Sequence, residues 1–208
     1  MKTTLLAITA FFATIAFSSN TAMAQANEKM KPGDALPTVN QPLKDATSDG
    51  NVTYLNKAAG KNGLIVMFSC NTCPFVVKNQ PVTTRTLQFA SANGLGVIIV
   101  NSNEAKRDGD DAFEAMHKYA REQHYNVPYV MDENSKLADL FGANHTPEIF
   151  LFNNQGKLVY KGAMNDNPGN PSEAKVMYLE NAVKAMLAGN TPDPATTKSV
   201  GCSIKRKA

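Results

Sequence analysis

Apolar residues are grouped along the chain in two patterns: short unbroken runs, and longer stretches in which they recur every three or four positions. The unbroken runs are typical of strands, and those without any polar residue predict strands buried on both faces of a sheet. The runs that predict strands, with or without a polar residue at one end, occupy 64–68, 97–100, 129–131, 148–152 and 158–161. The last two flank the turn Asn153-Asn154-Gln155-Gly156 and therefore predict a hairpin.

The stretches with helical spacing predict three helices in the first two thirds of the chain. One begins soon after the 64–68 strand and continues to about residue 93. Pro81 should kink or divide it, because proline cannot donate a backbone hydrogen bond. The other two helices are expected over 108–124 and 135–141.

A fourth helix is expected near the end of the chain. It opens with Asn170-Pro171-Ser172-Glu173, which combines a capping residue, a first-turn proline and a glutamate able to reach back to the cap. The helix should end at Gly189. Residues 190–208 then form a C-terminal tail with little apolar content.

The order of these elements predicts an α/β fold with a central mixed β-sheet. A strand, a helix, a parallel strand and a further helix, followed by a hairpin and a closing helix, describe a sheet covered by helices on both faces. Residues 36–60 contain the turn Ser48-Asp49-Gly50 and predict a small N-terminal hairpin extension. We expect one domain over 36–189.

The first 24 residues have the order of a secretory signal peptide. Lys2 precedes an apolar run at 5–17, and small residues end at Ala24, after which cleavage is expected. The run is shorter than the roughly 20 residues that a membrane span needs, so no stable membrane insertion is expected once the signal is removed. An uncleaved anchor is the alternative. Residues 25–35 are polar and predict a flexible leader.

Charge narrows the class of partner. The chain has 21 Lys and Arg against 18 Asp and Glu, a formal net charge of +3. No basic run is interleaved with aromatic residues, so nucleic acid is not expected as a partner.

The three cysteines are the residues most indicative of chemistry. Cys70 and Cys73 are separated by Asn71 and Thr72 directly after a predicted buried strand, and Cys202 lies in the tail. An odd, small number of cysteines in an exported chain does not resemble a structural disulfide framework. It is typical of a redox pair with one additional thiol.

A Cys-x-x-Cys turn at a helix start suits thiol-disulfide exchange. Unsatisfied N–H groups and the positive end of the helix dipole lower the pKa of a nearby thiol, and the thiolate is the reactive form. The motif predicts Cys70 as the attacking nucleophile and Cys73 as the residue that resolves the mixed disulfide. A half metal site or an inert disulfide remains an alternative, although no second Cys or His pair at close spacing accompanies the motif.

The motif Cys70-Asn71-Thr72-Cys73-Pro74 after a buried strand, with Thr146-Pro147 before a hairpin, resembles the redoxin and peroxiredoxin-like branch of the thioredoxin superfamily. It is similar in its order of elements to exported TlpA-type proteins. The resemblance implies a thioredoxin-like fold and a cis peptide bond before Pro147, which would present the backbone of Thr146 to a substrate strand. It implies a periplasmic thiol-disulfide oxidoreductase without a cofactor, acting on protein dithiols or disulfides together with a redox partner.

Several residues are possible accessories to this site. Thioredoxins have a buried acid six residues before the first cysteine, where this chain has Leu64, so Glu148 is a candidate for proton transfer. His145 could tune the thiolate or contribute to a metal site, or be a loop histidine with a single hydrogen bond. Cys202 could fold back as a further resolving thiol, or be free or paired with another molecule.

Two other functions are compatible with this fold. A peroxiredoxin-like thiol peroxidase would need the order Pro-x-x-x-Thr-x-x-Cys, which precedes neither Cys70 nor Cys73. A Sco-type copper metallochaperone would use soft thiolates, with His145 as a third ligand. Sco-type sites separate their cysteines by three residues and have a downstream histidine, for which this chain offers no candidate after His145. No metal site is therefore expected.

Overall fold

The computed structural model describes residues 29–48 and 51–207. Its strands are β1 (Leu43–Asp45), β2 (Val52–Thr53), β3 (Gly63–Ser69), β4 (Gly96–Asn101), β5 (Tyr129–Met131), β6 (His145–Thr146), β7 (Glu148–Asn153), β8 (Leu158–Gly162) and β9 (Cys202–Ser203). Its α-helices are α1 (Pro74–Lys78), α2 (Gln80–Ala92), α3 (Phe113–Glu122), α4 (Lys136–Phe141) and α5 (Tyr178–Leu187).

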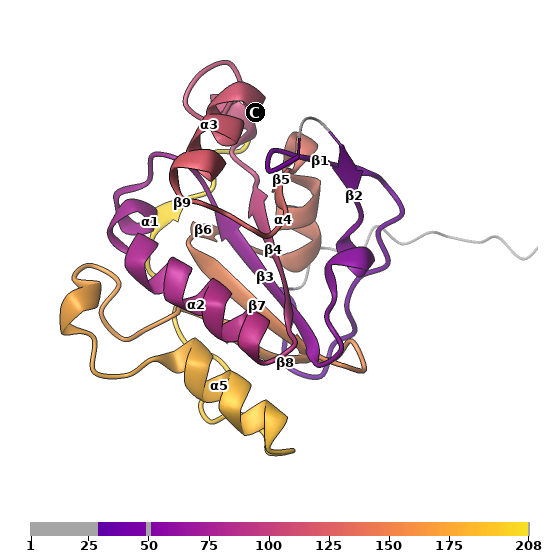
Figure 1. Cartoon of the computed structure of the whole chain (residues 1–208), viewed down its shortest axis with the longest axis vertical. Helices are drawn as coiled ribbons and strands as arrows, with labels where there is room; N and C mark the ends of the chain where they lie inside the picture. Colours follow the sequence, from indigo (N-terminus) through magenta and orange to yellow (C-terminus); the bar gives the residue numbers. More distant parts are fainter. Residues whose placement is uncertain (1–28, 49–50, 208) are drawn as a thin grey trace, which may run out of the picture.

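Seven strands form one mixed sheet in the order β2-β1-β5-β4-β3-β7-β8 (Figure 1). β3 lies parallel to β4, β4 lies parallel to β5, and β7 is antiparallel to both β3 and β8. β1 and β2 form the expected N-terminal hairpin, which adds to the edge beside β5. The predicted α/β class and mixed sheet are confirmed.

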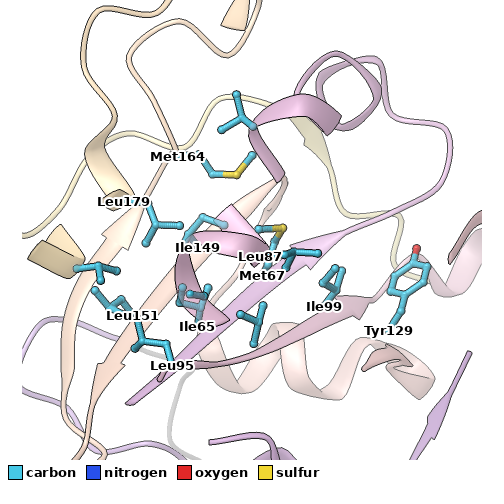
Figure 2. Close-up of a cluster of buried hydrophobic side chains, with 14 of the residues drawn as sticks. Ile65, Met67, Leu87, Leu95, Ile99, Tyr129, Ile149, Leu151, Met164 and Leu179 are labelled. Carbon is cyan, nitrogen blue, oxygen red and sulfur yellow. The ribbon is translucent and has the colours of Figure 1, made fainter. Parts of the chain in front are cut away.

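Each face of the sheet is buried under helices. Alternate residues of β3 point to opposite faces, so Ile65 and Met67 pack under α2, α3 and α5, while Val66 and Phe68 pack toward α4. Figure 2 shows the first of these clusters, in which strand side chains meet Leu87 of α2. Because β3 is buried on both sides, its unbroken apolar run is explained, and the strand fixes the position of the residues that follow it.

The helix after β3 is divided, as Pro81 predicts. α1 ends at Lys78 and α2 begins at Gln80, with Pro81 in the first turn of α2, where no backbone donor is needed. Asn79 joins the two helices, and its side chain donates to the carbonyl oxygen of Phe75 at 2.7 Å.

The last helix begins later than predicted. Residues Pro171–Glu173 form only a 3-10 turn, and α5 starts at Tyr178. The carboxylate of Asp166 accepts hydrogen bonds from the backbone N–H groups of Lys175 and Val176 at 2.9 and 3.1 Å. These amides are thereby held in a loop and cannot continue the helix that the capping pattern favours.

Part of the expected flexible leader and most of the tail contact the domain. Met30 is buried against the α4 face, and Gly33 donates a backbone hydrogen bond to Leu158, so residues 29–35 of the expected flexible leader are packed on the domain. The tail also returns to the domain, since β9 pairs with β6 and Ile204 is buried. Nonlocal pairing of this kind leaves no periodic signal in a short segment.

The expected signal peptide at 1–24 and the first residues of the leader, 25–28, lie outside the described residues. Among the described ranges, no helix combines the length and the apolar character required to cross a membrane.

Candidate redox site

The Cys-x-x-Cys turn connects the end of β3 to the start of α1. Cys70 follows Ser69 directly, and Cys73 is the N-cap residue of α1. Both side chains are buried, with exposed fractions of 2% for Cys70 and 5% for Cys73. Both are free thiols, as is Cys202. Because β3 is locked between two cores, the turn has a fixed position relative to the sheet.

Thr146 lies against both sulfurs. The peptide bond between Thr146 and Pro147 is cis, as the sequence resemblance implied. The Sγ of Cys70 lies 3.4 Å from the hydroxyl of Thr146, and the S–H of Cys73, when protonated, donates to the Thr146 carbonyl oxygen at 3.3 Å. The two predicted parts of the site, 73 or more residues apart in the chain, are thus brought together.

The two thiols of the turn share a proton unequally. A hydrogen bond with Cys73 and burial raise the pKa of Cys70. The S–H of Cys70 in turn lowers the pKa of Cys73 to about 4, against the opposing effect of burial, with help from the S–H of Cys202 and the backbone N–H groups of Val76 and Cys202. The sequence motif predicted that Cys70 would be the thiol with the lowered pKa. The structure gives Cys73 more donors because it caps α1 and lies beside the tail.

This asymmetry predicts the alkylation profile of the reduced protein. As the pH falls from 9, Cys73 should stay ionised and reactive until the pH approaches about 4, whereas Cys70 should stay protonated and slow. Pulse alkylation with iodoacetamide at graded pH, quantified for each cysteine by mass spectrometry, measures both. The denatured chain is the control, because both thiols then titrate in the ordinary range. Equal native rates for the two cysteines would contradict the asymmetry.

A network of buried polar side chains holds the Cys-x-x-Cys turn in place. The backbone N–H of Asn71 donates to the carboxylate of Asp111 at 3.0 Å, and the Asn71 side-chain oxygen accepts from the hydroxyl of Tyr129 at 2.8 Å. Asp111 also accepts from the side chains of Asn101 and Asn103 at 2.7 and 2.9 Å. These contacts hold the backbone of the turn beside Asn101 at the carboxyl end of β4 and Tyr129 at the start of β5.

Sequence reasoning missed this network. It included Asp111 in a helix expected over 108–124, whereas α3 begins only at Phe113. The side chain of Asp111 is fully buried beneath the turn, whereas residues 108–110 are exposed and form turns in place of the expected helix. The available signal was the polar run Asn101-Ser102-Asn103, which directly follows a buried strand.

Tyr129→Phe should lower the stability of the domain without changing its fold. The Tyr129 hydroxyl donates to Asn71 and accepts from Asn101 at 2.9 Å in a fully buried location, so its removal leaves two buried polar partners unsatisfied. We expect the free energy of unfolding to fall by about 1–3 kcal/mol. Urea denaturation measures this, with Tyr54→Phe on the exposed surface as the control. An equal loss in both variants would contradict the role assigned to the network.

The expected accessories Glu148 and His145 flank Thr146 and Pro147 in the chain, and the polar contacts of their side chains join them to each other and to Asn144. One Glu148 oxygen accepts from the backbone N–H groups of Asn144 and His145 at 2.8 and 3.0 Å, and the His145 ring nitrogen lies 3.9 Å from the same oxygen. Within 29–48 and 51–207, no hydrogen bond joins either side chain to a sulfur. The same residues contain no group of three His, Cys, Asp or Glu arranged to hold a metal ion. Leu64, at the place of the thioredoxin acid, is a buried core residue.

Cys202 lies beside the Cys-x-x-Cys pair. It packs against the small cluster formed by Cys70, Cys73 and Val76, and it is partly exposed. Burial and the neighbouring Cys73 raise its pKa to about 11. The folding back that the sequence left open is therefore present, and of the two cysteines of the turn it is Cys73 that affects the pKa of Cys202.

Comparison with known proteins places the chain in a family. The Redoxin family model matches residues 31–178. The thiol-disulfide oxidoreductase ResA of Bacillus subtilis (strain 168) is 26% identical over 132 residues, which are 64% of this chain and 67% of ResA.

Two solved structures resemble the whole domain. An uncharacterized conserved protein from Geobacillus kaustophilus is 32% identical, with a TM-score of 0.77 over 85% of this chain and 93% of that one. The hypothetical protein SMc02350 from Sinorhizobium meliloti 1021 is 30% identical, with a TM-score of 0.78 over 87% and 97%. The chain therefore belongs to the redoxin family of thioredoxin-like oxidoreductases.

Proposed function

We propose that this protein is an exported thiol-disulfide oxidoreductase that exchanges disulfides with protein substrates through Cys70 and Cys73. The observation that carries the proposal is the pair of clustered, buried thiols at the start of α1, both in contact with Thr146. Such a pair provides an ionised sulfur and a second thiol within reach of it, which are the two requirements of exchange.

The exchange proceeds in two steps and conserves electrons. The thiolate of one cysteine attacks a substrate disulfide, forms a mixed disulfide and releases one substrate thiolate. The other cysteine, as a thiolate, then attacks the mixed disulfide, closes the Cys70–Cys73 bond and releases the second substrate thiolate. The substrate gains two electrons and the protein loses two; the reverse order of steps oxidises a substrate dithiol.

Attack by Cys70 is the order that we favour for the productive form. If the shared proton moves to Cys73, its S–H donates to the Thr146 carbonyl oxygen, and the Thr146 hydroxyl can donate to a thiolate on Cys70. Two of the donors that favour ionised Cys73 come from Cys202 in the tail. Departure of the tail would therefore shift the proton toward Cys73 and the charge toward Cys70.

Two further features support a protein substrate outside the cytoplasm. Val77, on the first helix after the cysteines, has an exposed fraction of 51%, and Pro74 beside Cys73 is also exposed, so apolar surface borders the site. The N-terminal sequence has the order of a secretory signal, which supports export to a periplasm where disulfides persist.

The reduction potential of the Cys70/Cys73 couple, measured together with turnover on insulin disulfides, tests the proposal. We expect a reversible two-electron couple in glutathione buffers and catalytic reduction of insulin when a dithiol regenerates the enzyme. Absence of insulin turnover both in the full chain and in the Gly201→Ala variant described below would contradict the function.

A further inference from the structure

The C-terminal tail already occupies the strand position beside the cysteines. β9 pairs antiparallel with β6, so that Cys202 lies opposite Thr146 and Ser203 lies opposite His145 (Figure 1). In the described part of the chain these two strands form a sheet of their own, separate from the seven-stranded sheet. The edge of Thr146, where the proposed substrate strand would add, therefore carries a segment of the same chain.

The tail is anchored on both sides of this crossing. Upstream, the Thr197 hydroxyl hydrogen bonds with the hydroxyl of Tyr160 at 2.6 Å, and the Thr197 backbone N–H donates to Lys161. Downstream, Ile204 is buried on the α4 face, and the backbone N–H of Lys205 donates to the side chain of Asn103 at 2.9 Å. The segment between these anchors is thus held across the two thiols of the turn.

Close backbone contact places Gly201 directly on Thr146. A Cβ atom added to Gly201 would lie 2.1 Å from the Thr146 carbonyl oxygen and 2.7 Å from its carbonyl carbon, too close for any side chain. The tail can therefore follow this path only with glycine at position 201. The tail satisfies this requirement with Gly201-Cys202.

Cys202 is thereby presented to Cys73. Its S–H and its backbone N–H are close enough to the Cys73 sulfur to help lower the pKa of Cys73. The pair packs in one cluster with Cys70. Three sulfurs are then adjacent in the order Cys70, Cys73, Cys202, with the partly exposed one at the end of the row.

We propose that residues 198–203 are an internal occupant of the substrate-strand position, and that Cys202 forms a disulfide with Cys73 that locks the tail over the site. The proposal rests on the function proposed above, because it assigns to the tail the place of a substrate protein. The tail would then exclude protein substrates from the site until it is displaced. The oxidised protein would contain a Cys73–Cys202 disulfide and keep the site covered by the tail.

The step that forms this bond is balanced within the chain. The Cys202 thiolate attacks Cys73 of the Cys70–Cys73 disulfide, a Cys73–Cys202 bond forms, and Cys70 leaves as a thiolate that takes up the proton lost by Cys202. No electron is gained or lost. In a chain that lacks Cys70, oxidised glutathione supplies the oxidant: two thiols lose two electrons to one glutathione disulfide, which leaves as two glutathione thiols.

Disulfide mapping of the oxidised protein tests the covalent part. The Cys70→Ser variant, equilibrated with oxidised and reduced glutathione, digested at low pH and examined by mass spectrometry, should contain a peptide pair joined through Cys73 and Cys202 within one chain. The Cys73→Ser variant is the matched control and should lack it. If Cys202 is recovered only as a free thiol, a glutathione adduct or a link between two chains, the proposed bond is refuted.

Dislodging the tail tests the occupancy. Gly201→Ala introduces the clash with Thr146 while keeping all three cysteines, and it should raise the rate of insulin reduction by roughly tenfold or more, because the open form is no longer a minor population. Gly169→Ala is the matched control, since the nearest atom to its added Cβ, an Asn167 side-chain oxygen, is 4.0 Å away. Its rate should equal that of the unaltered chain.

An unchanged or lower insulin rate in a folded Gly201→Ala variant would overturn the occupancy. Protease sensitivity at 198–203 keeps the test decisive if that variant folds poorly. This measurement uses the chain without any substitution. Closing its Cys73–Cys202 bond should slow protease cleavage within 198–203 at least several-fold relative to the reduced protein. Equal cleavage of the oxidised and reduced forms would refute the lock, whereas loss of insulin turnover in every variant would refute the underlying function instead.

Discussion

Cys70→Ser and Cys73→Ser should each lower the rate of insulin disulfide reduction by roughly a thousandfold or more. Serine has the same shape as cysteine with a smaller polar atom and can still hydrogen bond, but it cannot form a disulfide, so neither variant can complete the two-step exchange. Both cysteines are buried at a helix start whose position depends on the core under β3, and serine is compatible with that packing. The measurement is insulin turnover at fixed dithiol concentration, with circular dichroism to verify folding.

Cys202→Ser provides the contrast within the same protein. Cys202 is outside the turn, and the Cys70–Cys73 exchange does not require it, so its replacement should leave insulin turnover at or above that of the unaltered chain. Retention of catalysis by Cys70→Ser would refute the proposed roles of the pair. A loss in Cys202→Ser as deep as that in Cys73→Ser would mean that Cys73 and Cys202, and not the turn, form the working couple.

The central strands and their order could be predicted because local pattern and tertiary environment agree there. The run at 64–68 became β3 at Gly63–Ser69, since a strand buried on both faces needs apolar residues at every position. Pro81 divided the following helix for a reason that is entirely local. The capping pattern at Asn170 predicted a helix that the carboxylate of Asp166 prevents. The side chain of Asp166 competes with the helix for the backbone N–H groups of residues 175 and 176, and this contact is visible only in the folded structure.

The sequence predicted which residues gather at the candidate site and missed the residues that surround them. Cys70, Cys73, Thr146 and Pro147 follow from motifs, and the structure brings them into contact. The polar residues that hold the turn could not be found in this way, because Asp111 in isolation is an ordinary surface acid of a helix. The β6–β9 pair was also beyond reach, since two residues of strand carry no period and their partner lies 56 residues away in the chain.

Differences in proton placement show why the tail matters to the chemistry of the turn. A free helix start would favour the thiolate on the first cysteine, as the motif predicts. In the folded chain, Cys70 and, to a smaller extent, Cys202 lower the pKa of Cys73, while Cys73 and burial raise the pKa of Cys70. Loss of the contacts with Cys202 should therefore raise the pKa of Cys73 and weaken its preference for the thiolate form.

Asp111→Ala should have the largest effect on stability among substitutions near the site that spare the cysteines. The Asp111 carboxylate accepts from the Asn71 backbone and from the side chains of Asn101 and Asn103, all buried, so its removal leaves three donors without their acceptor. We expect the free energy of unfolding, measured in urea, to fall by about 3–5 kcal/mol. Its negative charge also helps to raise the pKa of Cys70, so the pH at which Cys70 becomes half reactive should move downward.

Asp110→Ala is the matched control for this substitution. Asp110 is the adjacent acid, its side chain is exposed, and it contacts Asn71 only through its backbone carbonyl oxygen, at 2.7 Å, which alanine retains. Its free energy of unfolding and the alkylation profile of Cys70 should therefore remain close to those of the unaltered chain. Equal destabilisation by both substitutions would show that the loop as a whole, and not the Asp111 carboxylate, supports the turn. A stable Asp111→Ala protein with an unshifted Cys70 profile would refute both the structural and the electrostatic role.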